Sequence, residues 1–204
     1  MTTISQYPLS IKGAYRLYAL RVIRGLYHVP RTGYKDRGVK RPESVGQHVQ
    51  ELLEMADFFF PNCRGLKAML KIHDWPEYKK KVGDRRTDKY CPEDHRYTLE
   101  EKRIAELAAM EEICARLGPY GKAKLKLWLE YEAGKTLRAK RAYQLDKLQT
   151  DLKSAKYQMA GQPISAAQFI ELNKNKIIIP ELRMILEEME LKLQKYLTSK
   201  KIKQ

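Results

Sequence analysis

The chain has 204 residues, of which 43% are hydrophobic and 32% are charged, as is typical of a soluble globular protein. This length suits one domain with a substantial core and is short for two. No apolar run approaches the roughly 18 residues of a membrane span, and no secretory leader is recognisable. Three widely spaced cysteines, Cys63, Cys91 and Cys114, disfavour a disulfide framework or a thiolate zinc site and predict a cytoplasmic location.

The net charge of +15 is unevenly distributed along the chain. Residues 9–41 contain nine lysines and arginines and a single acid, Asp36, and further basic clusters lie at 79–81, 85–86 and 200–203. The region 9–41 and the clusters at 79–81 and 85–86 are consistent with a positive field that attracts phosphorylated substrates or nucleic acid, but also with solvated helix faces. The last one is typical of a frayed tail.

Hydrophobic periodicity predicts helices along most of the chain. Ser44 is a suitable N-cap for a helix that continues to Phe60, and His48 lies on the apolar face of that helix. Leu66, Met69, Leu70 and His73 follow the i, i+3, i+4, i+7 pattern, which places a second histidine on an inward face.

The second half of the chain shows clear start and stop signals. Thr98 and Glu101 form a capping-box pattern for a helix to about residue 117. Further helices are predicted over about 122–133, with Gly134 as the stop, and about 136–159. Residues 161–163 break the pattern, Ser165 restarts it, and a terminal helix follows Pro180. No alternating strand pattern is present, so we predict an all-α fold.

His48 and His73 alone do not establish a metal site, because a histidine on an apolar helix face is more often a core residue. Asp74 changes the case, since a buried carboxylate is costly unless a cation or donor compensates it. With the distant Asp146 the pattern reads H…HD…D. Such ligands suit Mn²⁺, Co²⁺, Fe²⁺, Ni²⁺ or Zn²⁺. Chance matches to this pattern occur, so the residues alone leave the site open.

Longer motifs carry a more specific resemblance. They are RTGYKDRGVKRPESVGQH at 31–48, IHDWPEYKKKVGD at 72–84, EEKRIAE at 100–106, LWLEYEAG at 127–134 and DKLQ at 146–149. In order and spacing they resemble the HD-domain phosphohydrolases of the 5′-deoxynucleotidase type, over about residues 26–157. The resemblance implies that one divalent metal ion binds His48, His73, Asp74 and Asp146. It also implies a nucleotide substrate and is compatible with a homodimer.

The same resemblance implies roles for four further residues. Glu77 and Asp84 would be catalytic, with Glu77 orienting water or moving its proton, and Arg31 and Tyr34 would contact the substrate. From the residues alone, Arg31 could be a surface cation, Glu77 could pair with Lys80 or Lys81, and Asp84 could be a turn residue after a glycine.

The sequence departs from the family pattern at three places. Trp75-Pro76 stands where small or aliphatic residues are usual, and the proline is expected to kink or end the helix and re-aim Glu77. Gln149 replaces a common glutamate, and Tyr34 replaces a common tryptophan. These departures affect substrate choice more than metal binding.

Three functions are consistent with these observations. The favoured one is a metal-dependent phosphohydrolase of (deoxy)nucleoside 5′-monophosphates. The alternatives are a dNTP triphosphohydrolase, which the extra basic residues would suit, and a basic helical nucleic-acid-binding module with a structural HD site. No aromatic-interleaved basic stripe supports the last one. We expect an HD-domain core over 1–160, a helical extension with a basic tail over 161–204, and no membrane partner.

Overall fold

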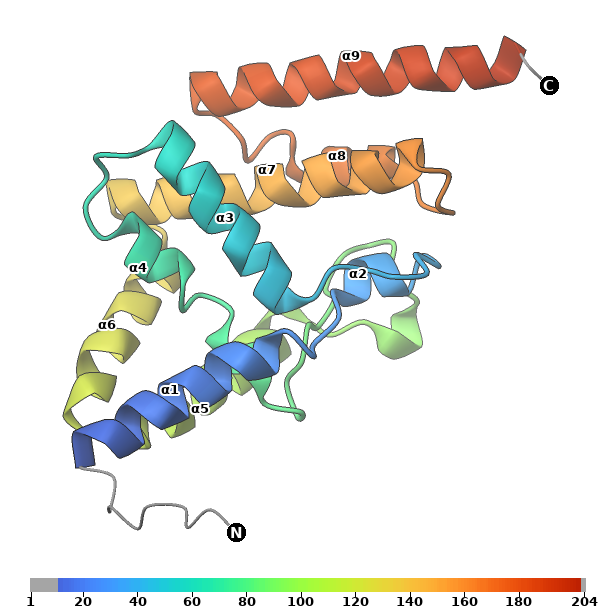
Figure 1. Ribbon diagram of the computed structural model, residues 1–204. Helices are drawn as coiled ribbons and strands as arrows, with labels where there is room; N and C mark the ends of the chain where they lie inside the picture. Colours follow the sequence, from blue (N-terminus) through green and yellow to red (C-terminus); the bar gives the residue numbers. More distant parts are fainter. Residues whose placement is uncertain (1–10, 203–204) are drawn as a thin grey trace, which may run out of the picture.

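The structure is a computed structural model that describes residues 11–202. The first ten residues, with the start of the basic region at 9–41, and Lys203 of the predicted tail lie outside the described residues. Residues 11–202 form helices and turns without a strand, which confirms the all-α prediction (Figure 1). No helix in this range is sufficiently long and apolar to span a bilayer. The α-helices are α1 Ile11–Leu26, α2 Thr32–Lys35, α3 Val45–Phe59, α4 Leu66–Leu70, α5 Leu99–Ala115, α6 Pro119–Ala133, α7 Leu137–Met159, α8 Ala166–Asn173 and α9 Pro180–Ile202.

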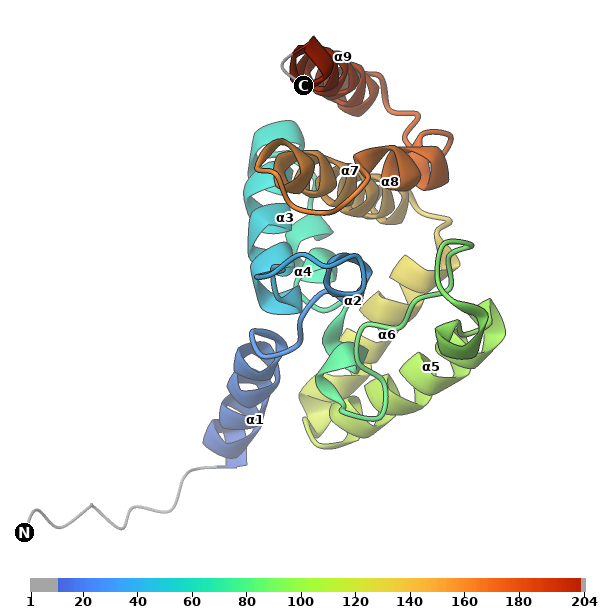
Figure 2. The same cartoon turned by 90° about the vertical axis from the view of Figure 1, so that its right-hand side faces the viewer.

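Helix α7 is the central element of the fold. It packs against α3, α4, α6, α8 and α9. In Figures 1 and 2, α7 and α8 lie between α9 on one side and α1, α5 and α6 on the other. Because α7 touches helices that precede and follow it in the chain, its buried side chains are held by packing from several directions.

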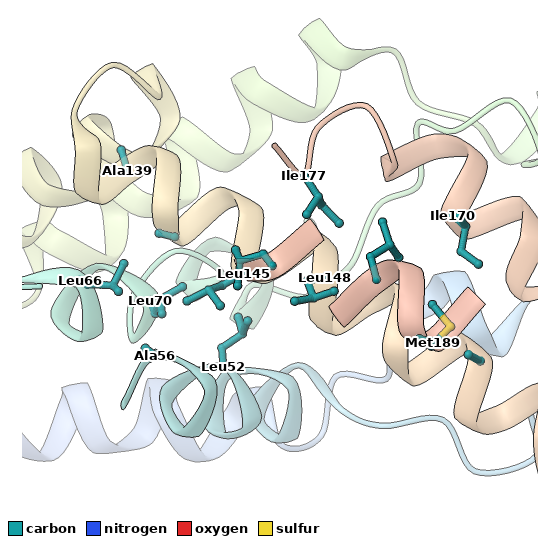
Figure 3. Packing of buried hydrophobic residues seen from close by; sticks show 14 of the residues in the cluster. Leu52, Ala56, Leu66, Leu70, Ala139, Leu145, Leu148, Ile170, Ile177 and Met189 are labelled. Carbon is teal, nitrogen blue, oxygen red and sulfur yellow. The ribbon is translucent and has the colours of Figure 1, made fainter. Parts of the chain in front are cut away.

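Two apolar clusters make up most of the core. The larger one surrounds α7, where Leu145 and Leu148 meet Leu52 of α3 and Leu70 of α4 (Figure 3). The smaller one joins α1, α5 and α6, and its buried members include Val22, Ile72, Trp75, Met110 and Trp128. The larger cluster continues into α8 and α9, so residues on both sides of the predicted boundary at 160 share one core.

Most predicted helix ends match the structure for the expected reasons. Ser44 and Thr98 each form a capping box. The capping side chain accepts a hydrogen bond from the backbone N–H three residues on, and the side chain of that residue accepts one from the backbone N–H of the cap. The hydroxyl of Thr136 accepts from Ala139 at the start of α7. Gly134 ends α6 in the left-handed conformation with φ 61°. These ends are therefore determined by local chemistry.

The helix that begins at Leu66 is shorter than predicted, because the apolar pattern extended it through His73. Helix α4 ends at Leu70, and residues 71–74 form turns. A short 3₁₀ helix, η1 at Trp75–Tyr78, follows. Pro76 has no N–H to donate to the Ile72 carbonyl oxygen, so an α-helix cannot continue unbroken through this segment. His73 and Asp74 consequently lie in a turn.

Helix α9 contributes to stability through its buried face, and this can be tested with a matched pair. Leu186 is fully buried in the larger cluster, whereas Leu191 on the same helix is 58% exposed. We expect Leu186→Ala to lower the free energy of unfolding by about 2–5 kcal/mol. Leu191→Ala should change it by less than about 0.5 kcal/mol. Urea unfolding followed by circular dichroism measures both changes. If Leu186→Ala had as small an effect as Leu191→Ala, α9 would not be part of the core.

Candidate active site

The four predicted metal ligands lie together in the folded chain. His48 comes from α3, His73 and Asp74 from the turn after α4, and Asp146 from α7. His48 Nε2 lies 3.1 Å from Asp146 Oδ1 and 3.7 Å from Asp74 Oδ2, and His73 Nε2 lies 3.1 Å from the same Asp74 oxygen. We call these residues the histidine–aspartate cluster.

Both imidazole rings are held by their Nδ1 atoms. Nδ1 of His48 lies 2.7 Å from Gln149 Oε1, and Nδ1 of His73 lies 2.8 Å from the Leu70 carbonyl oxygen. Since both partners are acceptors, each Nδ1 donates, and the tautomer leaves the Nε2 lone pair free. Both Nε2 atoms therefore face the centre of the cluster as potential ligands.

The cluster fits a cation. Nε2 of His48, Nε2 of His73 and Oδ2 of Asp74 are buried and have no hydrogen-bond partner. Ligand atoms of these three residues lie within 4.8 Å of one another. Burial alone would raise the pKa of Asp74, but the imidazoles of His73 and His48, when they carry a proton on Nε2, and the Arg31 guanidinium outweigh it and hold that pKa below its usual range. An ionised carboxylate and two free imidazole lone pairs are the donors that a transition-metal ion prefers.

Helix α6 supports the turn that carries His73. The indole Nε1 of Trp128 donates to the His73 carbonyl oxygen at 2.9 Å. The ring of Tyr131 meets the His73 imidazole edge-on at 5.2 Å between centroids. Trp128 and Tyr131 both belong to the LWLEYEAG segment, so this motif has a structural task at the site.

Glu77 lies on η1 with its side chain directed into the interior. It is 2% exposed, and its Oε2 has no hydrogen-bond partner. Burial and the charges of Asp74 and Asp84 raise the pKa of Glu77 well above its usual range. Among the described residues no lysine lies within ion-pair distance of it, so its surroundings differ from those of a surface salt bridge. Glu77 lines the same cavity as His73 and Asp74. The catalytic role of Glu77 stays a prediction.

Arg31 lies beside the cluster. Its Nη1 is 3.7 Å from Asp74 Oδ2, and its Nη2 donates to Thr150 Oγ1 at 3.4 Å. The backbone N–H of the next residue, Thr32, donates to Asp84 Oδ2 at 2.5 Å. Asp84 therefore anchors the segment that carries Arg31, whatever else it does. The substrate contact of Arg31 and the catalytic role of Asp84 stay predictions.

Tyr34 is 1% exposed and packs inside a small apolar cluster. Its ring stacks on Phe169 of α8, with the centroids 5.3 Å apart, and its hydroxyl donates to the Thr150 carbonyl oxygen at 2.9 Å. These contacts hold the tyrosine in place, and its role in substrate binding stays a prediction.

Two cavities meet at the site. The first, of about 460 Å³, is lined by His73, Asp74, Glu77 and Asp146, and we call it the histidine cavity. The second, of about 440 Å³, is lined by Tyr34 and Thr150 and by three residues of α8; we call it the tyrosine cavity. Those three residues are Phe169, Leu172 and Asn173. Both cavities share a border that includes Arg31, Asp84, Lys147 and Lys176.

The basic clusters have different environments. Arg86 is buried and pairs with Asp36 and Asp88, at 3.1 and 3.0 Å. Lys79 pairs with Glu112 of α5. Arg31 lines both cavities, whereas Lys40 is exposed. Several of the basic residues are therefore engaged in ion pairs within the protein and do not contribute a free positive charge to the site.

Sequence reasoning assigned no role to several residues that line or support the cavities. Lys147 Nζ lies 2.7 Å from Asp146 Oδ2, and Lys102 Nζ lies 3.5 Å from Glu106 Oε1. Lys147 directly follows the predicted ligand Asp146, and Lys102 lies within the EEKRIAE motif. Their positions in the sequence could therefore have marked both lysines as candidate site residues. Asn173 carried no such signal.

A sequence model of the HD domain family matches residues 23–183. The chain belongs to this family. It is 32% identical over 197 residues to the human (Homo sapiens) 5′-deoxynucleotidase HDDC2, covering 93% of this chain and 92% of that protein. The zebrafish (Danio rerio) 5′-deoxynucleotidase HDDC2 is 30% identical over 179 residues, covering 85% of each chain. The resemblance read from the motifs is thereby confirmed.

Solved structures show the same HD-domain fold. A predicted metal-dependent phosphohydrolase from Magnetospirillum magnetotacticum has a TM-score of 0.67 and 20% identity, covering 92% of this chain and 97% of that one. The protein PH0347 from Pyrococcus horikoshii has a TM-score of 0.64 and 20% identity, covering 88% and 99%. The family match ends at residue 183, beyond the predicted core boundary, so all of α8 and the first residues of α9 are matched as well.

The ligand prediction is tested by removing one charge. We expect Asp74→Asn to lose most bound metal while it keeps a helical circular dichroism spectrum, because the amide has the same size but no anionic donor. The control is Asp57→Asn, which changes an exposed carboxylate of α3 that pairs with Lys67. Metal analysis after dialysis against Mn²⁺ measures the result. Full occupancy in Asp74→Asn would reject the ligand set.

Proposed function

We propose that this HD-domain protein is a metal-dependent phosphohydrolase that releases phosphate from (deoxy)nucleoside 5′-monophosphates. The observation that carries the proposal is the convergence of three buried, unpartnered ligand atoms, those of His48, His73 and Asp74. His73 and Asp74 line a cavity that Arg31 also lines. The relatives named 5′-deoxynucleotidase, matched over most of both chains, support the same activity.

His48, His73, Asp74 and Asp146 would hold one divalent ion, which we propose to be Mn²⁺, Co²⁺, Fe²⁺, Ni²⁺ or Zn²⁺. When bound, such an ion neutralises phosphate charge and lowers the pKa of a water molecule. The tautomers of both histidines are already set for this task by their Nδ1 hydrogen bonds. Little reorganisation of the rings is therefore needed on binding.

Arg31 is suited to bind the phosphate. Its guanidinium is a planar donor fork that matches two phosphate oxygens, which the ammonium of a lysine does not. The backbone of its segment is held by Asp84 through Thr32 and by the Glu43 carbonyl oxygen, which accepts from Arg31 N–H at 2.9 Å. A substrate phosphate in the histidine cavity would lie between this fork and the metal ligands.

Glu77 is suited to handle the proton of the attacking water. The carboxyl is buried at the wall of the histidine cavity, where burial and the charges of Asp74 and Asp84 raise its pKa above the usual range. A carboxyl in this position can exchange a proton with a water molecule in the cavity. Attack on phosphorus in line with the nucleoside 5′-oxygen breaks the P–O bond, and the leaving oxygen gains a proton.

The tyrosine cavity is suited to the nucleoside. It adjoins the histidine cavity through Arg31 and has a mixed lining, with Phe169 and Leu172 as apolar surface and Thr150 and Asn173 as polar groups. Its volume of about 440 Å³ lies in the range of small-ligand sites, about 300–1,000 Å³. Since α8 supplies part of this wall, the region after residue 160 would take part in substrate binding.

The proposed reaction is tested by metal analysis of the purified protein and a screen of dAMP, AMP, dADP and dATP with Mn²⁺ or Co²⁺ present. We expect inorganic phosphate from the monophosphates. Release of triphosphate from dATP, without turnover of dAMP, would establish the dNTP triphosphohydrolase alternative. Nucleic-acid binding with a steep salt dependence and no hydrolysis would establish the binding-module alternative.

Arg31 should differ in kind from neighbouring cations. Arg31→Lys keeps the charge but loses the fork, so kcat/KM for dAMP should fall by about two orders of magnitude at both low and high salt. The control is Lys40→Ala, whose exposed charge should matter by less than about 1 kcal/mol and fade at high ionic strength. Equal, small and salt-sensitive defects in both variants would show that the surface merely attracts anions.

Glu77→Gln tests the proton-transfer role. The amide occupies the same volume but cannot exchange a proton, so turnover should fall by about 10²-fold or more. Metal content should stay near that of the parent, because Glu77 is not among the ligands. A variant that turns over normally would assign proton transfer to another group, and one that loses metal would make Glu77 a ligand.

A further inference from the structure

Gln149 has hydrogen-bond contacts that a packing role does not require. It lies on α7, three residues after Asp146, and is 1% exposed. Its Oε1 accepts from His48 Nδ1 at 2.7 Å. Its Nε2 donates to Glu51 Oε2 at 2.7 Å and faces both Glu43 oxygens at 3.1 and 3.2 Å. Both ends of the amide are therefore occupied, each by a group of the matching kind.

The carboxylates determine which way the amide points. Burial raises the pKa of Glu51, but hydrogen bonds from Lys153 and Gln149 outweigh it and leave that pKa below its usual range. Lys153 Nζ lies 2.5 Å from Glu51 and 3.2 Å from Glu43. Ionised carboxylates only accept hydrogen bonds, so the NH₂ group of Gln149 must face them. The carbonyl of the amide is thereby directed to His48.

We infer that Gln149 is a positioning residue that fixes the tautomer and ring orientation in which His48 serves as a metal ligand. The inference rests on the proposed metal site. With Oε1 as its neighbour, His48 keeps its proton on Nδ1 and turns Nε2 toward Asp74 and Asp146. Partners of this kind typically contribute about 10–100-fold in metal affinity.

A glutamine suits this position better than the obvious substitutes. A leucine or methionine would leave the His48 N–H without an acceptor, and a buried unsatisfied donor is costly. An ionised carboxylate would accept from His48 but would face Glu43 and Glu51, with Lys153 as the nearby cation. An amide accepts on one side and donates on the other, as the two neighbours demand.

The chain provides a matched control on the same helix. Gln144 is also a buried glutamine of α7, and its Oε1 accepts from the backbone N–H groups of Ile178 and Ile179, both at 2.8 Å. It ties α7 to the start of α9 and has no contact with a histidine. Replacing it removes a buried amide of equal size without touching the site.

The experiment compares Gln149→Met with Gln144→Met. Titration with Co²⁺ or Mn²⁺ should show about 10–100-fold weaker binding in Gln149→Met. Gln144→Met should lower the melting temperature yet bind metal within about twofold of the parent, because its loss is purely structural. Nitrogen-15 NMR of the metal-free protein should show the Nδ1–H tautomer of His48 in the parent and in Gln144→Met. In Gln149→Met the tautomers should be mixed.

A double-mutant cycle tests the link to the carboxylates. Glu51→Leu should weaken metal binding in the parent, since it removes the shortest hydrogen bond of the amide and leaves only the longer contacts to Glu43. In the Gln149→Met background the same change should have no further effect, because the connecting amide is gone. If the losses of metal affinity in the two single variants simply added in the double variant, Glu51 would not act through Gln149.

The outcomes separate this inference from the proposed function. A parent protein that binds no metal would remove the metal site and the inference with it. A parent that binds metal but leaves all nucleotides intact would reject only the proposed activity. Unchanged metal affinity and an unchanged His48 tautomer in Gln149→Met, or equal losses in both glutamine variants, would overturn the positioning role.

Discussion

The buried position of His48, between an amide on one side and two carboxylates on the other, constrains much of this structure. A fully buried imidazole must satisfy Nδ1 and Nε2 separately. Nδ1 is satisfied by Gln149, and Nε2 is directed at Asp74 and Asp146. Helix α7 must therefore lie at one height and one rotation relative to α3, because two of these partners belong to it.

The same helix meets this demand and builds the core. Asp146 and Gln149, three residues apart, face the site, while Leu145 and Leu148 enter the larger apolar cluster. Packing against α3, α4, α8 and α9 then limits movement of α7 along its axis. A shift of α7 along its axis by one residue, about 1.5 Å, would separate Gln149 from His48. The apolar contacts therefore preserve the hydrogen-bond geometry of the site.

Local signals in the sequence were sufficient for much of the fold. The capping boxes at Ser44 and Thr98 and the left-handed Gly134 act within a few residues, so the helix ends they determine were predictable. The all-α class followed from periodicity alone. The early end of the helix after Leu66 was only partly anticipated. Pro76 was expected to kink or end that helix, but the helix already stops at Leu70.

Contacts between distant segments were beyond the reach of the sequence. The ligand residues were recognisable from motifs, but nothing local joins Gln149 to Glu43 and Glu51, about a hundred positions away. Likewise, Asn173 enters the wall of the tyrosine cavity only because α8 folds back along α7. Such partners are brought together by tertiary packing, which cannot be predicted from the type of a single residue.

Electrostatics at the site depends on individual pairings more than on the net charge of +15. Arg86 and Lys79 pair with nearby carboxylates, whereas Arg31 lies 3.7 Å from Asp74 and lines both cavities. A cation so placed can exchange a long ion pair for a bidentate phosphate contact without leaving a buried charge unpaired, provided that another cation compensates Asp74. Metal binding and phosphate recognition would then be coupled through one carboxylate, and the same residue that holds the metal would release the arginine for the substrate.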